Sequence, residues 1–188
     1  MNVCLDLREL ISNIKKNKQE VSIKARGYNV VILLGGNIGD VRENFKTAQS
    51  ELSYLGIINM ESSLYRTEAW GMEGADPFLN QVLILNTDLE AEQLLKNILS
   101  IERMMGRQRK DGDSYISRNI DIDILFIDSL IFESSKLEVP HPRLHLRKFT
   151  LAPLVELIPD FEHPILKKSI LELSKELKDS LTVEQLDE

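Results

Sequence analysis

The chain has 188 residues, of which 43% are apolar and 28% charged, and this composition excludes a disordered or fibrous protein. Its single cysteine, Cys4, excludes an internal disulfide framework and a cysteine-based zinc site, and it favours a cytoplasmic location. The net charge is -7 and no apolar stretch reaches the roughly 20 residues that cross a bilayer, so we expect neither nucleic acid nor a membrane as a partner.

The first 27 residues are expected to form a short helical extension followed by a linker. Asp6 and Glu9 have the spacing of a capping box. The apolar residues that recur on one helical face after it are Leu7, Leu10, Ile11 and Ile14. We therefore divide the chain into an extension over 1–27, one domain over 28–180 and a C-terminal tail over 181–188.

Within the domain, the apolar periodicity predicts elements in the order β-α-β-β-α-β. The expected strands cover 29–34, 57–65, 78–87 and 120–127, and the expected helices cover 41–55 and 89–105. Two more helices, over 148–157 and 169–178, follow a proline-rich passage. This order predicts an α+β fold with a ferredoxin-like βαββαβ core, a C-terminal helical addition and the short N-terminal helical extension.

The sequence Asp121-Ile122-Asp123-Ile124 carries the strongest chemical signal. In a strand, residues two apart point to the same face, so both carboxylates face one side while Ile120, Ile122 and Ile124 pack into the core. Paired carboxylates can bind a hard divalent cation. The alternative is the solvated face of an amphipathic strand.

Basic residues flank this carboxylate pair and favour the metal interpretation. The flanking residues are Arg103, Arg107, Arg109, Lys110, Arg118, His141, Arg143, His145, Arg147 and Lys148. Guanidinium groups neutralise phosphate oxygens, and a cation held by aspartates bridges them, so the cluster predicts a magnesium-polyphosphate site. For residues 107–110 alone the alternative is a solvated loop, and for His141 it is an ordinary loop histidine.

The glycine-rich segment 35–39 fits neither a Walker loop nor a dinucleotide-binding motif. We interpret it as a structural connection from a strand to a helix.

Several separate motifs together resemble a known family. They are Leu34-Gly35-Gly36-Asn37-Ile38-Gly39-Asp40, Ser62-Ser63-Leu64-Tyr65-Arg66-Thr67, Trp70-Gly71, Phe78-Leu79-Asn80-Gln81, Ile101-Glu102, Gly106-Arg107, Arg118-Asn119-Ile120-Asp121-Ile122-Asp123-Ile124-Leu125 and Val139-Pro140-His141-Pro142-Arg143. In this order they resemble the 6-hydroxymethyl-7,8-dihydropterin pyrophosphokinase family, from about Tyr28 to Lys178. One departure is Tyr115-Ile116-Ser117, which stands where that family usually has Trp-Gly-Pro.

The resemblance implies an enzyme of folate biosynthesis that transfers diphosphate from ATP to the hydroxymethyl group of the pterin and releases AMP. It implies two Mg2+ ions as cofactors and a ferredoxin-like α+β fold. The implied catalytic residues are Arg107, Arg118, Asp121 and Asp123, and the implied metal ligands are Asp121 and Asp123.

The resemblance also assigns two substrate pockets. The implied ATP-binding residues are Glu102, Arg107, Arg109, Lys110, Tyr115, Arg118, Ile124, His141 and Arg147. The implied pterin-binding residues are Thr67, Trp70, Phe78, Asn80, Asp121 and Phe149. An aromatic pair such as Phe78 and Phe149 can enclose a flat heterocycle, and the Asn80 amide offers its edge both a donor and an acceptor.

The mechanism expected from these assignments is in-line attack by the pterin hydroxyl on the β-phosphorus of ATP. Two alternatives are a non-catalytic ferredoxin-like module that binds a nucleotide or metal, and a kinase that transfers the γ-phosphoryl group. We favour the diphosphate transferase because a sensor needs no flat-ring pocket beside a two-carboxylate metal site. The expected partners are ATP and 6-hydroxymethyl-7,8-dihydropterin, and we expect a monomer.

Overall fold

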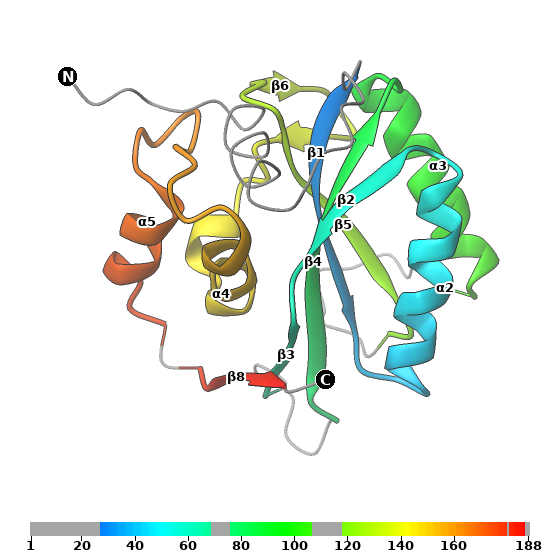
Figure 1. The fold of residues 1–188 in the computed structure, drawn as a ribbon, viewed down its shortest axis with the longest axis horizontal. Helices are drawn as coiled ribbons and strands as arrows, with labels where there is room; N and C mark the ends of the chain where they lie inside the picture. The colour runs from blue at the N-terminus through cyan, green and yellow to red at the C-terminus, as the bar shows by residue number, and fades with distance from the viewer. Residues whose placement is uncertain (1–26, 69–75, 107–117, 180, 187–188) are drawn as a thin grey trace, which may run out of the picture.

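The computed structural model describes residues 27–68, 76–106, 118–179 and 181–186. A six-stranded antiparallel sheet runs through the molecule in the order β5-β1-β4-β3-β8, with β2 also paired to β4 (Figure 1). Its strands are β1 (Tyr28–Gly36), β2 (Ile57–Glu61), β3 (Leu64–Thr67), β4 (Phe78–Thr87), β5 (Asp121–Ile127) and β8 (Val183–Leu186). The short strands β6 (Phe132–Glu133) and β7 (Glu138–Val139) form a separate ribbon.

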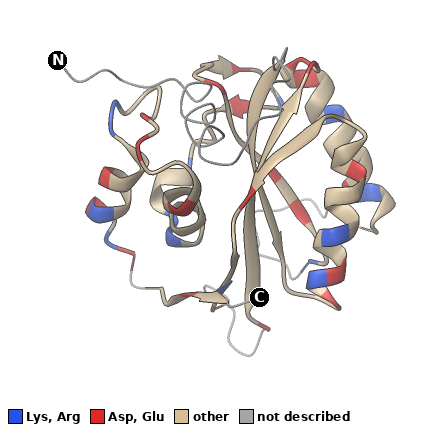
Figure 2. Ribbon diagram, in the orientation of Figure 1, with Lys and Arg blue, Asp and Glu red and all other residues tan. Residues whose placement is uncertain are grey.

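Helices cover both faces of the sheet. One face carries α2 (Val41–Ser53) and α3 (Ala91–Met104), which both contain basic and acidic residues (Figure 2). The other face carries α4 (Lys148–Leu157), preceded by the short helix η1 (Leu144–Leu146), and α5 (Ile170–Glu176). Within the described ranges, no helix combines the length and the apolar character needed to span a bilayer.

Each face of the sheet has its own apolar core because the side chains of a strand alternate between faces. Val30, Ile32 and Leu34 of β1 are fully buried on the side of α2 and α3. Val31 and Leu33 pack on the side of α4 and α5. The central strand is therefore almost continuously apolar, as expected for a strand buried on both faces.

A bulge in β5 changes which face its side chains occupy. Val31 pairs with Phe126 and Ile32 pairs with Ile124, so Leu125 is the extra residue between them. Leu125 and Phe126 consequently both pack beneath α4. Ile122 and Ile124 pack on the α2 side, which places the alternating residues Asp121 and Asp123 on the α4 side.

The α+β prediction and the order of its main elements are confirmed, but the strand predicted over 57–65 is two strands. At the break, the Ser62 hydroxyl accepts the Val82 N–H at 3.0 Å in place of a main-chain carbonyl, while the Ser62 N–H still donates to the Val82 carbonyl at 2.9 Å. The Ser62 carbonyl in turn accepts the Gln81 side-chain amide at 2.8 Å. Side-chain contacts thus interrupt the main-chain ladder between β2 and β3.

Strand β8 was not predicted from the sequence; it lies inside the predicted tail over 181–188 and pairs with β3. Of the predicted extension over 1–27, residues 1–26 lie outside the described residues.

Glu156 fastens α4 to the start of β3. Its carboxylate accepts the Ser63 N–H at 3.0 Å, the Ser63 hydroxyl at 3.1 Å and the Tyr65 hydroxyl at 2.9 Å. Burial, reinforced by the hydrogen bond and the negative charge of Glu156, raises the pKa of Tyr65. Helix and sheet are therefore held together at this corner by one acidic side chain.

We predict that Glu156→Ala lowers the free energy of unfolding by about 2 kcal/mol, because the half-buried donors lose a charged acceptor. Glu156→Gln retains one acceptor oxygen, so it loses less. Urea denaturation followed by circular dichroism measures both changes, with Glu133→Ala, at an exposed residue of β6, as the control. Equal stabilities for the Glu156→Ala and control variants contradict this role.

Candidate functional site

A row of polar side chains crosses the sheet on the α4 side, next to the apolar core. Gly35 of β1 pairs with Asn80 of β4 on one side and with Asp121 of β5 on the other. The buried Asn80 amide donates to the Thr67 hydroxyl of β3 at 3.1 Å. A Cβ at position 35 would lie 3.5 Å from the Asn80 amide oxygen, so glycine leaves the sheet surface open between Asn80 and Asp121.

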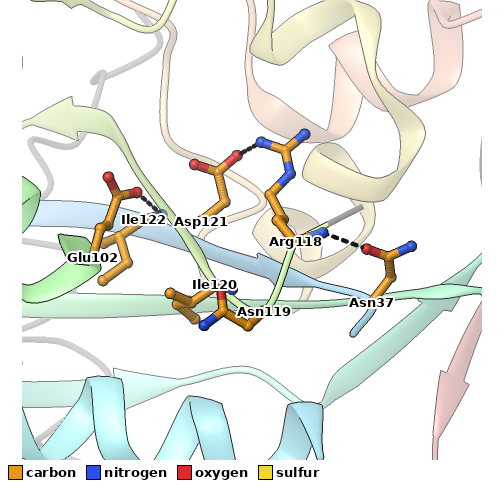
Figure 3. Close-up of polar contacts among 7 residues, drawn as sticks. All are labelled: Asn37, Glu102, Arg118, Asn119, Ile120, Asp121 and Ile122. Carbon is orange, nitrogen blue, oxygen red and sulfur yellow. Dashed lines mark hydrogen bonds and ion pairs between the residues drawn. The ribbon is translucent and has the colours of Figure 1, made fainter. Parts of the chain in front are cut away.

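Arg118 lies over the β5 end of this row. Its guanidinium forms an ion pair with Asp121, and the two side chains are only 23% and 15% exposed (Figure 3). The same guanidinium lies over the Phe78 ring, 5.9 Å from its centroid. The site therefore combines an aromatic face, a cation and a carboxylate in direct succession.

Asn37, at the turn after β1, holds the backbone of Arg118 in place. Its side-chain oxygen accepts the Arg118 N–H at 2.8 Å, and its own N–H donates to the Arg118 carbonyl at 2.9 Å (Figure 3). Its side-chain amide also donates to the carbonyl of Asp76, two residues before Phe78, at 3.2 Å. One buried side chain thus joins the segment that enters β4 to the segment that enters β5.

Close backbone contact strengthens the same junction. A Cβ at Gly36 would lie 2.7 Å from the Asn119 carbonyl oxygen, which is too close. Only glycine therefore allows this approach of the two backbones. The Asn119 carbonyl also accepts the Asn44 side-chain amide from α2 at 3.1 Å. The entry to β5 is therefore fixed from β1 and from α2.

Glu102 of α3 lies behind β5. Its side chain is 2% exposed, and one carboxylate oxygen accepts the Ile122 N–H at 2.9 Å (Figure 3). Ile122 lies between Asp121 and Asp123, so Glu102 fixes the backbone that carries both carboxylates.

His141 faces the row from the segment that leads into η1. The backbone N–H of His141 donates to the Leu125 carbonyl of β5 at 2.9 Å. The ring Nδ1 of His141 accepts the backbone N–H of Arg143 at 3.2 Å. The neutral ring therefore carries its proton on Nε2, ready to donate. Burial, followed by the charges of Arg147 and Arg143, lowers the pKa of His141 to about 4, and the charge of Asp121 partly opposes this shift.

Arg147 and Phe149 flank the first residue of α4. The Arg147 guanidinium lies over the Phe149 ring, 5.5 Å from its centroid. The charges of Arg147 and Asp121 both affect the pKa of His141, the first lowering it and the second raising it. Asp121 in turn pairs with Arg118, whose guanidinium lies over Phe78.

The residues predicted for the site fall into four groups. Those placed on or beside the polar row are Thr67, Phe78, Asn80, Arg118, Asp121, Asp123 and His141. Arg147 and Phe149 lie together at the start of α4. Ile124 packs in the core beneath α2 and α3, so only its backbone can contact a nucleotide, and Glu102 is buried. Trp70, Arg107, Arg109, Lys110 and Tyr115 lie outside the described residues.

The segment 35–39 does more than the structural connection predicted from the sequence. It does connect a strand to a helix, as predicted, but Gly35 also opens the sheet surface and Asn37 links two site segments. A buried asparagine in a turn is a usable signal, because an amide that donates and accepts at once joins two backbones.

Comparison with known proteins supports a single family. The family described as 7,8-dihydro-6-hydroxymethylpterin-pyrophosphokinase (HPPK) matches residues 31–159. A protein from Aquifex aeolicus named 2-amino-4-hydroxy-6-hydroxymethyldihydropteridine pyrophosphokinase is 37% identical over 78% of this chain and 91% of its own. A protein of the same name from Synechocystis sp. is 35% identical over 80% of this chain and 76% of its own. Another from Porphyromonas gingivalis is 39% identical over 72% of this chain and 93% of its own.

Solved structures share the fold. A crystal structure of Plasmodium falciparum HPPK-DHPS with pteroate matches 82% of this chain with a TM-score of 0.62 and 18% sequence identity. This chain spans 43% of that longer protein.

We predict that His141 titrates near pH 4 rather than near 6.5, because burial and two arginines disfavour its cation. The unfolded chain binds this proton more readily, so the contribution of His141 to stability decreases as pH falls from about 6.5 towards 4. NMR titration of the ring protons, assigned with His141→Gln, measures the midpoint. Arg147→Gln should raise it and Arg42→Gln, on α2, should not; a wild-type midpoint near 6.5 contradicts the prediction.

Proposed function

Because the chain belongs to the 7,8-dihydro-6-hydroxymethylpterin-pyrophosphokinase family, we propose that the polar row is its active site. The chain carries out the pyrophosphokinase step of folate synthesis. In our proposal it transfers diphosphate from ATP to the hydroxymethyl group of 6-hydroxymethyl-7,8-dihydropterin and releases AMP. The observation that carries this proposal is a spatial arrangement: Asn80, Gly35, Asp121 and Arg118 follow one another in this order across one face of the sheet. The comparisons give no support to a non-catalytic binding module.

We place the pterin at the β3 and β4 end of the row. Asn80 and Thr67 offer a buried amide and a hydroxyl to the edge of a heterocycle. A ring that leaves such buried groups without hydrogen-bond partners binds less tightly. Phe78 and Phe149 are the proposed walls, and Trp70 is proposed to complete the pocket. The opening at Gly35 then leads from the ring towards Asp121.

We place the polyphosphate of ATP at the β5 and α4 end. Arg118, Arg147 and the Nε2–H of His141 are donors there, and a neutral histidine donates without adding charge. Arg107, Arg109, Lys110 and Tyr115 are proposed to complete the nucleotide site, together with Glu102, which acts through the backbone of β5, and the backbone of Ile124.

The residues present fit a hard divalent cation. Asp121 and Asp123 are half-buried carboxylates on the same face of a strand, and oxygen ligands of this type suit Mg2+. No third histidine, cysteine or acidic residue joins them among the described residues, which suits an ion that takes its other ligands from phosphate and water. We propose two Mg2+ ions, which neutralise phosphate charge and make the pterin hydroxyl more acidic.

The chain's own residues then have separate tasks in an in-line attack on the β-phosphorus. Asp121 lies nearest the proposed position of the pterin hydroxyl and orients it. Arg118 forms an ion pair with Asp121, and we propose that its guanidinium binds the group that is transferred. Charge stabilisation by a preorganised arginine costs no reorganisation during the reaction, and Arg107 is proposed to share this task.

We also infer a ferredoxin-like βαββαβ core. The sheet order β5-β1-β4-β2, antiparallel throughout, supports this assignment. The domain over 28–180, a monomeric state and a cytoplasmic location complete the proposal.

The experiment that tests the function is product analysis with ATP, magnesium and the reduced hydroxymethylpterin. We expect AMP and pterin diphosphate in equal amounts, because attack at the β-phosphorus makes AMP the leaving group. A chelator should abolish both products. ADP as the main product indicates γ-phosphoryl transfer, and intact ATP with folded protein indicates that the chain only binds its ligands.

We predict that Asp123→Asn lowers kcat by roughly 100-fold or more while the fold stays largely intact, because a charged ligand is lost with little change in side-chain shape. Asp160→Asn removes the same charge from an exposed loop after α4 and serves as the control. Near-normal turnover by Asp123→Asn at limiting magnesium argues against the metal site.

A further inference from the structure

The start of α4 depends on a residue from a distant part of the chain. Arg147 occupies the N-cap position with an extended backbone, but its side chain makes no capping hydrogen bond. The first turn of α4 also contains no acidic residue. The helix therefore lacks, in its own sequence, the acceptor that the first N–H groups of a helix require.

Asp179, after α5, supplies this acceptor. One carboxylate oxygen accepts the N–H of Lys148, the first residue of α4, at 3.1 Å, and the other accepts the Leu181 N–H at 2.9 Å. The Lys148 ammonium closes the arrangement by donating to the Leu181 carbonyl at 3.0 Å. A carboxylate at the positive end of a helix is favourable in charge as well as in hydrogen bonding.

We propose that Asp179 is a positioning residue of the active site, which fixes Arg147 and Phe149 by capping the helix at the residue between them. This inference rests on the proposed function, since it concerns the residues placed there at the nucleotide and the pterin. Lys148 is bonded to Asp179 through its backbone, so its two neighbours share one fixed point. Loss of the cap frees the turn that carries both side chains.

The segment that carries Asp179 also reaches the opposite wall of the pterin pocket. Val183 of β8 pairs with Thr67 of β3, and Arg66 pairs with Glu184 at 2.7 Å beside it. The segment after α5 thus contacts the sheet on the Thr67 side and α4 on the Phe149 side.

The test compares steady-state kinetics of the wild type with Asp179→Ala, Asp179→Asn, Phe149→Ala and the double variant Asp179→Ala/Phe149→Ala. Glu176→Gln is the matched control, because it removes a carboxylate three residues before Asp179 but leaves the cap of α4 in place. The folded fraction of each variant is measured by thermal unfolding. Wild-type product analysis is run in parallel, so a failure of the proposed function is recognised independently of Asp179.

We expect Asp179→Ala to raise KM for the pterin and for ATP about fivefold each, with kcat per folded molecule unchanged. Asp179→Asn keeps one acceptor oxygen and should recover part of the loss, and Glu176→Gln should match the wild type. Asp179→Ala should raise the pterin KM no further when Phe149→Ala is already present, because it acts through that ring.

Other outcomes overturn the inference. If Asp179→Ala lowers only the folded fraction, with both KM values unchanged, the cap is merely structural. Additive effects of Asp179→Ala and Phe149→Ala on the pterin KM show that Asp179 does not act through the ring. If Asp179→Ala does not fold, the same criteria apply to Asp179→Asn.

Discussion

The pairing of β1 with β4 on one side and β5 on the other is the interaction on which the rest of the structure depends. Its apolar part is buried under helices on both faces and anchors both cores. Its glycine end continues the same ladder beyond the apolar cores, where Gly35 brings Asn80 and Asp121 to either side of one backbone position. A rigid, fully paired strand thus holds chemically different side chains at a fixed spacing, which loops alone do not achieve.

The sequence predicted the elements whose signal is local and strong. The strand at 120–127 and the helix at 148–157 follow from apolar runs and spacing, and the placement of Asp121 and Asp123 on one face follows from strand alternation. The break at Ser62 could not be predicted, because it depends on a hydrogen bond to Val82, a residue on another strand. Periodicity contains no information about such partners.

In the candidate site, too, local sequence features could be predicted and tertiary contacts could not. Residue types identified Arg118 and Asp121 as chemically active, but their ion pair and the contact of Arg118 with Phe78 arise only in the folded chain. β8 was missed because Val183 and Leu186 carry too short a pattern to indicate a strand, and its pairing with β3 is decided by tertiary contact. Single polar side chains such as Asn37 and Glu156 complete main-chain hydrogen bonding where regular structure ends.

The pairing of β8 with β3 has a consequence for biosynthesis. Residues 183–186 emerge from the ribosome after every other described element, so the outer hydrogen-bonding groups of β3 remain without their strand until that moment. An exposed strand edge invites pairing with other chains. In the interval between synthesis of α5 and docking of β8, the nascent protein can therefore already form its apolar cores while β3 is still an unpaired edge that can pair with other chains.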